Sequence, residues 1–208
     1  GTMKKYFVYL MMAFAVTASA SCTGNGYGSD GADGQPENPE NPNPSDTLSG
    51  ESNILVAYFS WSGNTERMAE QIVAQTGADL FSIEPVNPYP EDYTTCTEVA
   101  LEERDSDARP AIRTMIDADA WAAYDTVFIG CPVWWHTAPM IISTFAESYD
   151  FSGKTVVPFC TYAETYRDET LARIVELTPG AKHLKGFGAV DRNTDGITEW
   201  LEEIKLLK

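Results

Sequence analysis

Apolar runs and helical periodicities alternate along the chain from residue 53 to the C-terminus. The runs at residues 54–59, 80–83, 126–129, 155–159 and 183–190 predict five strands. The first run has no polar interruption, as is typical of a strand that is covered on both faces. Strands that alternate with helices predict an α/β fold, in which right-handed crossovers build a parallel sheet between two layers of helices.

Apolar stripes predict where the helices lie. Met68, Ile72 and Val73 share one helical face, with Asn64 as the expected N-cap and Gly77 as the stop. Further elements are expected as a helix at 97–104, a turn near 111–116, helices at 138–149 (Ile141 and Phe145 inward) and 168–177, and a last helix on the stripe Trp200, Leu201, Ile204 and Leu207. Pro158 cannot donate a ladder hydrogen bond, so the ladder should part beside it.

The N-terminal segment has the pattern of an export signal. Lys4 and Lys5 precede an apolar run at residues 6–16, which suits a signal peptide and is too short to span a bilayer. Cys22 follows small residues as in a lipobox, so residues 1–22 predict a signal peptide with Cys22 as the lipidation site. Ordinary cleavage after Ala20 is the alternative.

Lipidation at Cys22 would make the protein an exported, membrane-anchored lipoprotein, on the periplasmic side or the cell surface. Residues 23–52 are rich in Pro, Gly, Asn and acidic residues and contain almost nothing to bury, so they predict a flexible acidic linker. Residues 53–208 are the predicted folded domain.

The predicted domain is strongly acidic. The chain has a net charge of −17, and residues 53–208 hold 25 acidic against 12 basic side chains. This balance excludes nucleic acid as a partner, because a phosphate backbone requires a basic face. The charge either serves solubility or suits docking to a basic patch on a redox partner.

Three cysteines, Cys96, Cys131 and Cys160, lie in the predicted domain, so at least one is a free thiol or pairs with another chain. No C-x-x-C and no His/Cys cluster is present, so no metal site is predicted. Cys160 and Arg167 raise the alternative of a cysteine phosphatase. Their spacing is one residue longer than such a loop requires, and Glu164 would repel a phosphate dianion.

In a doubly wound sheet, ligands bind beyond the carboxyl ends of the strands. The first loop there reads Ser60-Trp61-Ser62-Gly63-Asn64-Thr65 and leads directly into a helix. Its hydroxyls, glycine and helix N-terminus suit an oxyanion, and it contains no Lys or Arg. The P-loop and dinucleotide fingerprints are absent. The loop predicts a neutral cradle for a terminal monophosphate, or else a plain capped helix start.

Ser60-x-Ser62-Gly63-Asn64-Thr65 after a Val-Ala-Tyr-Phe strand resembles the phosphate loop of flavodoxins. Residues 124–135, ending in Pro132-Val133-Trp134-Trp135 and followed by Ala138-Pro139, resemble a flavodoxin-like subfamily with a Pro-x-Trp-Trp loop; residues 145–161 continue the likeness. The resemblance covers about residues 53–208. It implies a flavodoxin-like three-layer sandwich with a five-stranded parallel sheet of order 2-1-3-4-5, bound FMN, and electron transfer or oxidoreductase chemistry at the flavin.

Three loops are expected to bind FMN. They contain Ser60, Trp61, Ser62, Gly63, Asn64, Thr65, Pro132, Val133, Trp134, Trp135, His136, Thr161, Tyr162, Ala163, Glu164 and Tyr166. At least one of the two adjacent Trp side chains should face the crevice and offer the flavin ring a flat apolar cover. His136 is expected on the surface of its loop, and His183 in a structural role.

The loop at residues 161–167 departs from the family. It lacks the usual glycines and carries Glu164, so Tyr162 or Tyr166 would have to stack on the ring in their place. A binding module that has lost its flavin is therefore an alternative. NAD(P)H, a quinone, or a redox protein with a basic patch are the candidate electron partners.

Overall fold

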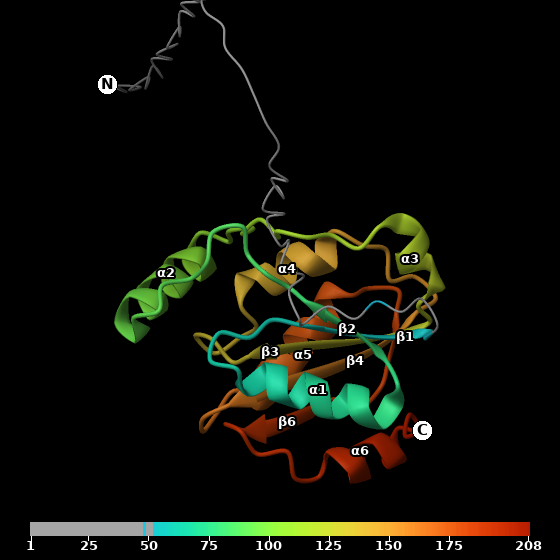
Figure 1. Ribbon diagram of the computed structural model, residues 1–208. Helices are drawn as coiled ribbons and strands as arrows, with labels where there is room; N and C mark the ends of the chain where they lie inside the picture. Colours follow the sequence, from blue (N-terminus) through green and yellow to red (C-terminus); the bar gives the residue numbers. More distant parts are fainter. Residues whose placement is uncertain (1–47, 49–51) are drawn as a thin grey trace, which may run out of the picture. The chain divides into compact units, whose positions relative to one another are not determined.

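A parallel sheet forms the middle layer of the fold. The computed structural model describes residue 48 and residues 52–208 of the chain. Its strands are β1 (Ile54–Tyr58), β2 (Asp79–Ser82), β3 (Thr126–Pro132), β4 (Thr155–Tyr162), β5 (Lys182–His183) and β6 (Phe187–Val190). They lie in the order β2-β1-β3-β4-β5, with β6 also paired to β4 (Figure 1). The predicted order 2-1-3-4-5 is confirmed.

The predicted fifth strand is divided into two short pieces, β5 and β6. β5 pairs with β4 at Thr155 and Val156, and β6 pairs with β4 from Phe159 onward, so Pro158 lies at the gap between them. At this gap a Cβ on Gly186 would lie 2.8 Å from the carbonyl oxygen of Pro158. The expectation that the ladder parts beside Pro158 is therefore confirmed.

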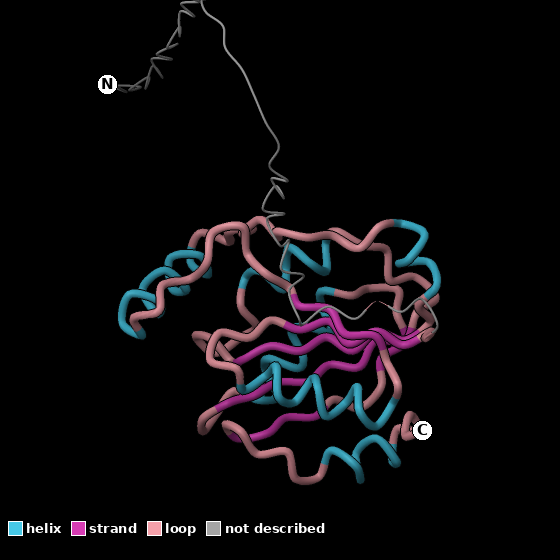
Figure 2. Tube along the Cα trace, viewed as in Figure 1, coloured by secondary structure: helices cyan, strands magenta, loops and turns pink. Residues whose placement is uncertain are grey.

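Helices cover both faces of the sheet (Figures 1 and 2). The helices α1 (Asn64–Thr76) and α6 (Ile197–Glu203) pack on one face, where Met68, Ile72 and Trp200 join the core. The helices α3 (Ala118–Ala123), α4 (Met140–Glu147) and α5 (Arg167–Leu177) supply the other core with side chains such as Ile141, Phe145 and Ile174. The inward positions of Ile141 and Phe145 are confirmed.

Two details of the predicted helices are wrong. The N-cap of α1 is Gly63, at φ 81°, and Asn64 is already helical, because only a glycine enters this left-handed conformation without strain. Leu207 lies beyond the end of α6 and is exposed, so it does not extend the apolar stripe. Gly77 ends α1 as predicted, with its N–H donating to the carbonyl of Val73.

The helix α2 (Tyr93–Asp105) differs from the other helices. It begins four residues before the predicted start, because the Asp92 carboxylate accepts the N–H of Thr95 and caps it. None of its residues belongs to either core. It extends past the carboxyl ends of the strands (Figure 1).

The predicted signal peptide with Cys22, and the predicted linker apart from residues 48 and 52, lie outside the described residues. Within residue 48 and residues 52–208, no helix has the length and apolar character needed to cross a bilayer.

Candidate functional site

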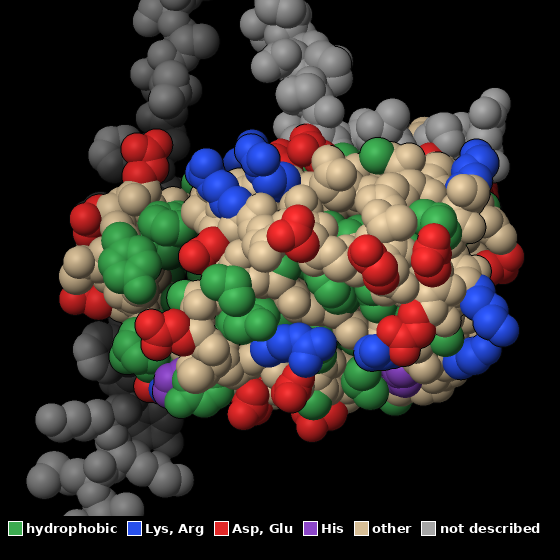
Figure 3. All heavy atoms as spheres, turned by 90° about the horizontal axis from the view of Figure 1, so that it is seen from below, with side chains coloured by type: hydrophobic (Ala, Val, Ile, Leu, Met, Phe, Trp, Pro, Cys, Tyr) green, Lys and Arg blue, Asp and Glu red, His purple; other side chains and the backbone are tan. Residues whose placement is uncertain are grey.

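A cleft of about 700 Å³ opens at the carboxyl edge of the sheet. The loops that follow β1, β3, β4 and β6 line it, and α2 forms a further wall. In the view of Figure 3 a hollow lies toward the left, with hydrophobic side chains beside it and acidic side chains nearby. This is where a doubly wound sheet places its ligand.

The loop after β1 presents an open helix N-terminus. No side chain caps α1, and the hydroxyl of Ser60 instead accepts the N–H of Gly63 at 3.1 Å, which shapes the turn. Ser62 and Asn64 line the cleft. The first N–H groups of a helix lack intrahelical partners, so this loop can receive an anion.

Two contacts at this loop join segments that are distant in the sequence. The Arg192 guanidinium, from the loop after β6, donates to the side-chain oxygen of Asn64 at 3.1 Å. The hydroxyls of Thr65 and Thr161 lie 2.8 Å apart and are buried, which ties α1 to the end of β4. The sequence-based picture of a cradle without a base therefore omitted Arg192, which is 128 residues from Asn64.

The loop after β3 is a tight turn. Trp134 and Thr137 exchange both backbone hydrogen bonds, and Trp135 and His136 between them have φ values of 45° and 72°. Non-glycine residues seldom adopt this left-handed conformation, and such strain is often found at functional sites. Trp134 packs edge-on against Phe59, whereas Trp135 is exposed. Both Trp side chains line the cleft, as expected of at least one of them.

The loop after β4 contacts the Trp loop and lines the cleft beside it. Tyr166 is left-handed at φ 64°, and its ring stacks on the imidazole of His136 with 3.8 Å between the ring centres. Glu164 is exposed at the cleft, and Arg167 pairs with Asp168 instead. His183 bonds to the hydroxyl of Thr178, in keeping with its expected structural role.

Helix α2 is fastened over the cleft by two indole groups. Trp61 donates its ring N–H to the carbonyl of Pro90 at 3.0 Å, and Trp135 donates to that of Thr97 at 2.7 Å. Arg104 lies over the Trp135 ring, 5.6 Å from its centre, and donates to the carbonyl of Trp135. These contacts position α2 even though it has no place in the core.

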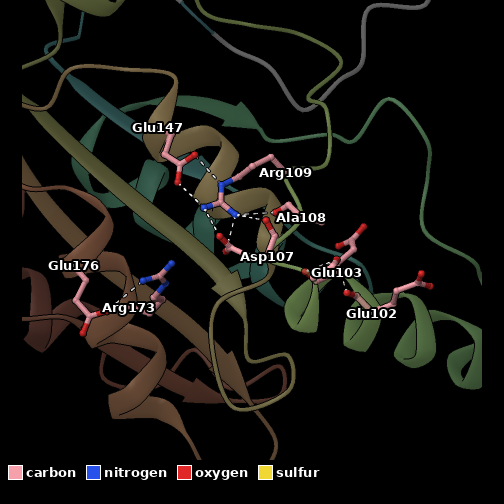
Figure 4. Close-up of polar contacts among 9 residues, drawn as sticks. Glu102, Glu103, Asp107, Ala108, Arg109, Glu147, Arg173 and Glu176 are labelled. Atoms are coloured by element: carbon pink, nitrogen blue, oxygen red, sulfur yellow. Dashed lines mark hydrogen bonds and ion pairs between the residues drawn. The ribbon is translucent and has the colours of Figure 1, made fainter. Parts of the chain in front are cut away.

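A bidentate ion pair secures the segment that follows α2. Figure 4 shows Arg109 between Asp107 and Glu147 of α4. Arg109 donates to the two carboxylate oxygens of Glu147 at 2.7 and 2.8 Å, and its hydrogen bonds hold the pKa of that carboxyl below its usual value. Exposed ion pairs contribute little to stability on their own, but the bidentate geometry of this pair fixes the orientation of the two side chains.

Most of the residues predicted to bind FMN surround the cleft. Ser60, Gly63 and Thr65 do not line it; they shape and anchor the first loop behind its surface. Prediction from the sequence missed the following lining residues: Tyr93, Cys96, Thr97, Ala100, Thr165 and Asp191. The four residues from α2 (93, 96, 97 and 100) are spaced along one helical face, and this spacing is the one signal from which the sequence could have predicted them.

The three cysteines of the described domain are free thiols and are buried. The Cys160 thiol points at the carbonyl of Arg167, and burial raises its pKa to about 12. A nucleophilic cysteine needs a thiolate, so the arrangement does not fit a cysteine phosphatase. Within the described residues no group of three or more His, Cys, Asp or Glu could hold a metal ion.

The comparisons with known proteins agree with the observed fold. A crystal structure from Bacteroides eggerthii, provisionally named a flavoprotein, has 36% identity, a TM-score of 0.63, and coverage of 73% of this chain and 97% of its own. A similarly named structure from Bacteroides uniformis has 33% identity, a TM-score of 0.62, and coverage of 72% and 97%. A flavoprotein of Lactobacillus acidophilus in complex with FMN has 24% identity, a TM-score of 0.59, and coverage of 71% and 97%.

A search of curated proteins finds no match. The model of the flavodoxin family, in contrast, matches residues 53–204, which is most of the chain and the whole of the described sheet. The chain therefore belongs to the flavodoxin family.

Proposed function

We propose that the protein binds FMN in the cleft and transfers electrons through it. The observation that carries this proposal is the joining, in one cleft, of an open helix N-terminus and a set of aromatic side chains. The FMN complex of the Lactobacillus acidophilus flavoprotein, which shares the fold, supports the choice of flavin.

The residues of the first loop fit a terminal phosphate. Ser62 and Asn64 offer polar groups at the cleft, the start of α1 offers backbone N–H groups, and Arg192 brings a positive charge beside Asn64. Hydrogen bonds between such donors and a charged oxygen are among the stronger ones in proteins. This end of the cleft would hold the phosphate of FMN.

The aromatic end of the cleft fits a flat ring. Trp134 and His136 lie on the loop after β3, and Tyr162 and Tyr166 lie on the loop after β4. Val133 donates its N–H to the carbonyl of Thr161 at 2.9 Å, so the two loops keep a fixed spacing at their base. A bound flavin would supply the redox chemistry, while these residues orient it and exclude water.

The stacked rings of His136 and Tyr166 favour one second candidate. These rings contact each other with no flavin between them, as would suit a binding module that has lost its flavin. The absorption spectrum of the purified protein decides between the two. A flavin spectrum, or one acquired after incubation with FMN, supports the proposal, and no flavin uptake at micromolar FMN contradicts it.

A titration with FMN and with riboflavin, which lacks the phosphate, tests the proposed orientation. Asn64→Ala should weaken FMN about tenfold or more, because it removes a hydrogen bond to a charged group. Riboflavin affinity should stay unchanged in the same variant, as should FMN affinity in the control Arg173→Gln on α5. Equal losses for the two ligands in Asn64→Ala would place the phosphate elsewhere.

We also propose that the protein is an exported lipoprotein anchored through Cys22, and that NAD(P)H, a quinone or a basic redox protein exchanges electrons with it. The support lies in the sequence of residues 1–22 and in the acidic charge of the domain. Cys22→Ala should release the protein from the membrane fraction. Retention of this variant after a salt wash would rule out the lipid anchor.

A further inference from the structure

One face of α2 is devoted to the cleft. Its lining residues, Tyr93, Cys96, Thr97 and Ala100, are spaced as i, i+3, i+4 and i+7, so they form a single stripe. Cys96 and Ala100 are buried, although no residue of α2 belongs to a core. Cys96 and Ala100 are therefore covered by the segments that border the cleft, while Tyr93 at the start of the stripe is open to solvent.

Two indole rings accompany the stripe. The ring of Trp61 lies 6.2 Å from that of Tyr93, and Trp135 is bonded to the backbone of α2 through Thr97. Both indole N–H groups are already satisfied by carbonyls of the α2 segment. What these rings leave for a ligand is flat apolar surface held in place, which is the surface that planar aromatic compounds recognise.

The charges around the cleft restrict the ligand further. None of the described residues that line it is Lys or Arg, while Glu164 and Asp191 contribute two carboxylates. The nearest base at the α2 side, Arg104, does not line the cleft and is already paired with Asp105 and with the carbonyl of Trp135. An anionic compound there would meet the carboxylates with no basic side chain of the lining to offset them.

We propose that the α2 stripe, with Trp61 and Trp135, forms a second subsite for a small, uncharged, planar aromatic compound next to the flavin. This inference rests on the proposed function for its role, since a compound bound there would lie beside the FMN. It names the class of electron partner and disfavours a phosphate-bearing dinucleotide as the occupant of this subsite.

Two naphthalene probes test the subsite on the FMN-loaded protein. Naphthalene-2-methanol is uncharged and naphthalene-2-sulfonate is anionic, and both are followed by their own fluorescence. We expect the uncharged probe to bind at least tenfold more tightly, without displacing FMN. Competition with FMN, or equal affinity for the two probes, would overturn the proposal.

Paired variants of α2 localise the binding. Ala100→Trp fills the stripe and should weaken the uncharged probe more than tenfold, with FMN affinity within about twofold of the original. Glu98→Trp adds the same ring at an exposed position of the same helix that does not line the cleft, and should change neither affinity. If Ala100→Trp weakens both FMN and the probe, the two ligands share one site, and the proposal of a second subsite is refuted.

A milder change guards against misfolding of the first variant. Tyr93 is 70% exposed, so Tyr93→Ala should fold normally. It should weaken the uncharged probe by about three- to tenfold, as the loss of one aromatic contact does. An unchanged probe affinity in Tyr93→Ala would count against the stripe.

The FMN titration keeps the two proposals separate. It is read from flavin fluorescence and does not involve the probes. If FMN fails to bind, the proposed function fails, and the probes are then applied to the flavin-free protein. If the uncharged probe binds the flavin-free protein, and Ala100→Trp abolishes this binding while Glu98→Trp does not, the subsite is supported without the flavin. If the probe does not bind, the subsite is refuted along with the proposed function.

Discussion

Helices α1 and α2 have 13 residues each and both border the cleft, yet they are built differently. α1 places Met68, Ala69 and Ile72 in a core beneath the sheet. α2 buries only Cys96 and Ala100, and it is held by two indole groups, an arginine and its N-cap.

The contrast shows that α1 mainly stabilises the fold, whereas α2 mainly lines the cleft. α1 gains its stability from the core, and under the proposed function its N-terminus would bind the phosphate. α2 adds little to the core, so core packing does not restrict its side chains, and they can differ according to the ligand of the cleft. Substitutions in the two helices should therefore affect different properties of the protein.

The largest effect is expected in the core of α1. Ile72→Ala removes a fully buried side chain and should lower the free energy of unfolding by about 2–5 kcal/mol. Leu101 of α2 is only half-buried, so Leu101→Ala should lower the free energy of unfolding by less than about 1 kcal/mol. Urea unfolding measures both, and similar losses would erase the distinction between the two helices.

A smaller effect is expected where α1 meets β4. Thr65→Val leaves the buried hydroxyl of Thr161 without its partner, which should cost about 1–3 kcal/mol. The double variant Thr65→Val/Thr161→Val removes both hydroxyls and should recover much of this loss. Thermal unfolding of the single and double variants decides it, and additive losses would show that the two hydroxyls act separately.

On the α2 side, Trp135→Phe deletes the N–H that bonds the carbonyl of Thr97 while keeping an aromatic ring. The net worth of such a bond is about 0.5–1.5 kcal/mol. The loss should be local: hydrogen exchange should quicken in α2 and stay unchanged in α1. Faster exchange in both helices would mean that α2 is coupled to the core after all.

The smallest effect concerns Glu103, which accepts a 2.8 Å hydrogen bond from Tyr89 beside Cys96. Burial raises the pKa of the Glu103 carboxyl, and the bond from Tyr89 only partly opposes this. The folded state therefore holds a proton that the unfolded state releases near pH 4.5. The stability from this group is full below that pH and is lost as the pH rises through the raised value.

Glu103→Gln should accordingly gain stability relative to the original protein as the pH rises from about 4 to 7. The difference between their urea midpoints is the measurement, since it cancels the titration of other carboxyls. The exposed neighbour Glu102→Gln is the matched control and should show a flat difference. A flat difference for Glu103→Gln as well would contradict the effect of burial on its pKa.

Local patterns in the sequence predicted the strands and the parallel sheet, whereas the order 2-1-3-4-5 came from the resemblance to flavodoxins. The unbroken apolar run of β1 and the stop at Gly77 depend on neighbouring residues alone, so they could be read directly. The six-residue α3 was missed, because so short a helix leaves no clear period. The early start of α2 was missed too, because its amphipathic stripe consists of Tyr, Cys, Thr and Ala and has little hydrophobic contrast.

The parts of the candidate site that could be predicted are those whose residues are contiguous within one loop. The Ser-rich loop and the Trp pair stand out as contiguous residues, and both border the cleft. The contact of Arg192 with Asn64 and the stacking of His136 on Tyr166 join separate loops. Such contacts depend on how the loops come together in space, which no local pattern records.

The division of the fifth strand at Pro158 also bears on association between chains. An edge strand with a long free ladder invites pairing with the edge of another molecule, which leads to aggregation. Here the edge beside β4 is occupied by pieces of two and four residues, separated where Gly186 passes against the proline. Neither piece is long enough to nucleate a continuous ladder with a second chain, so this border of the sheet resists edge-to-edge polymerisation.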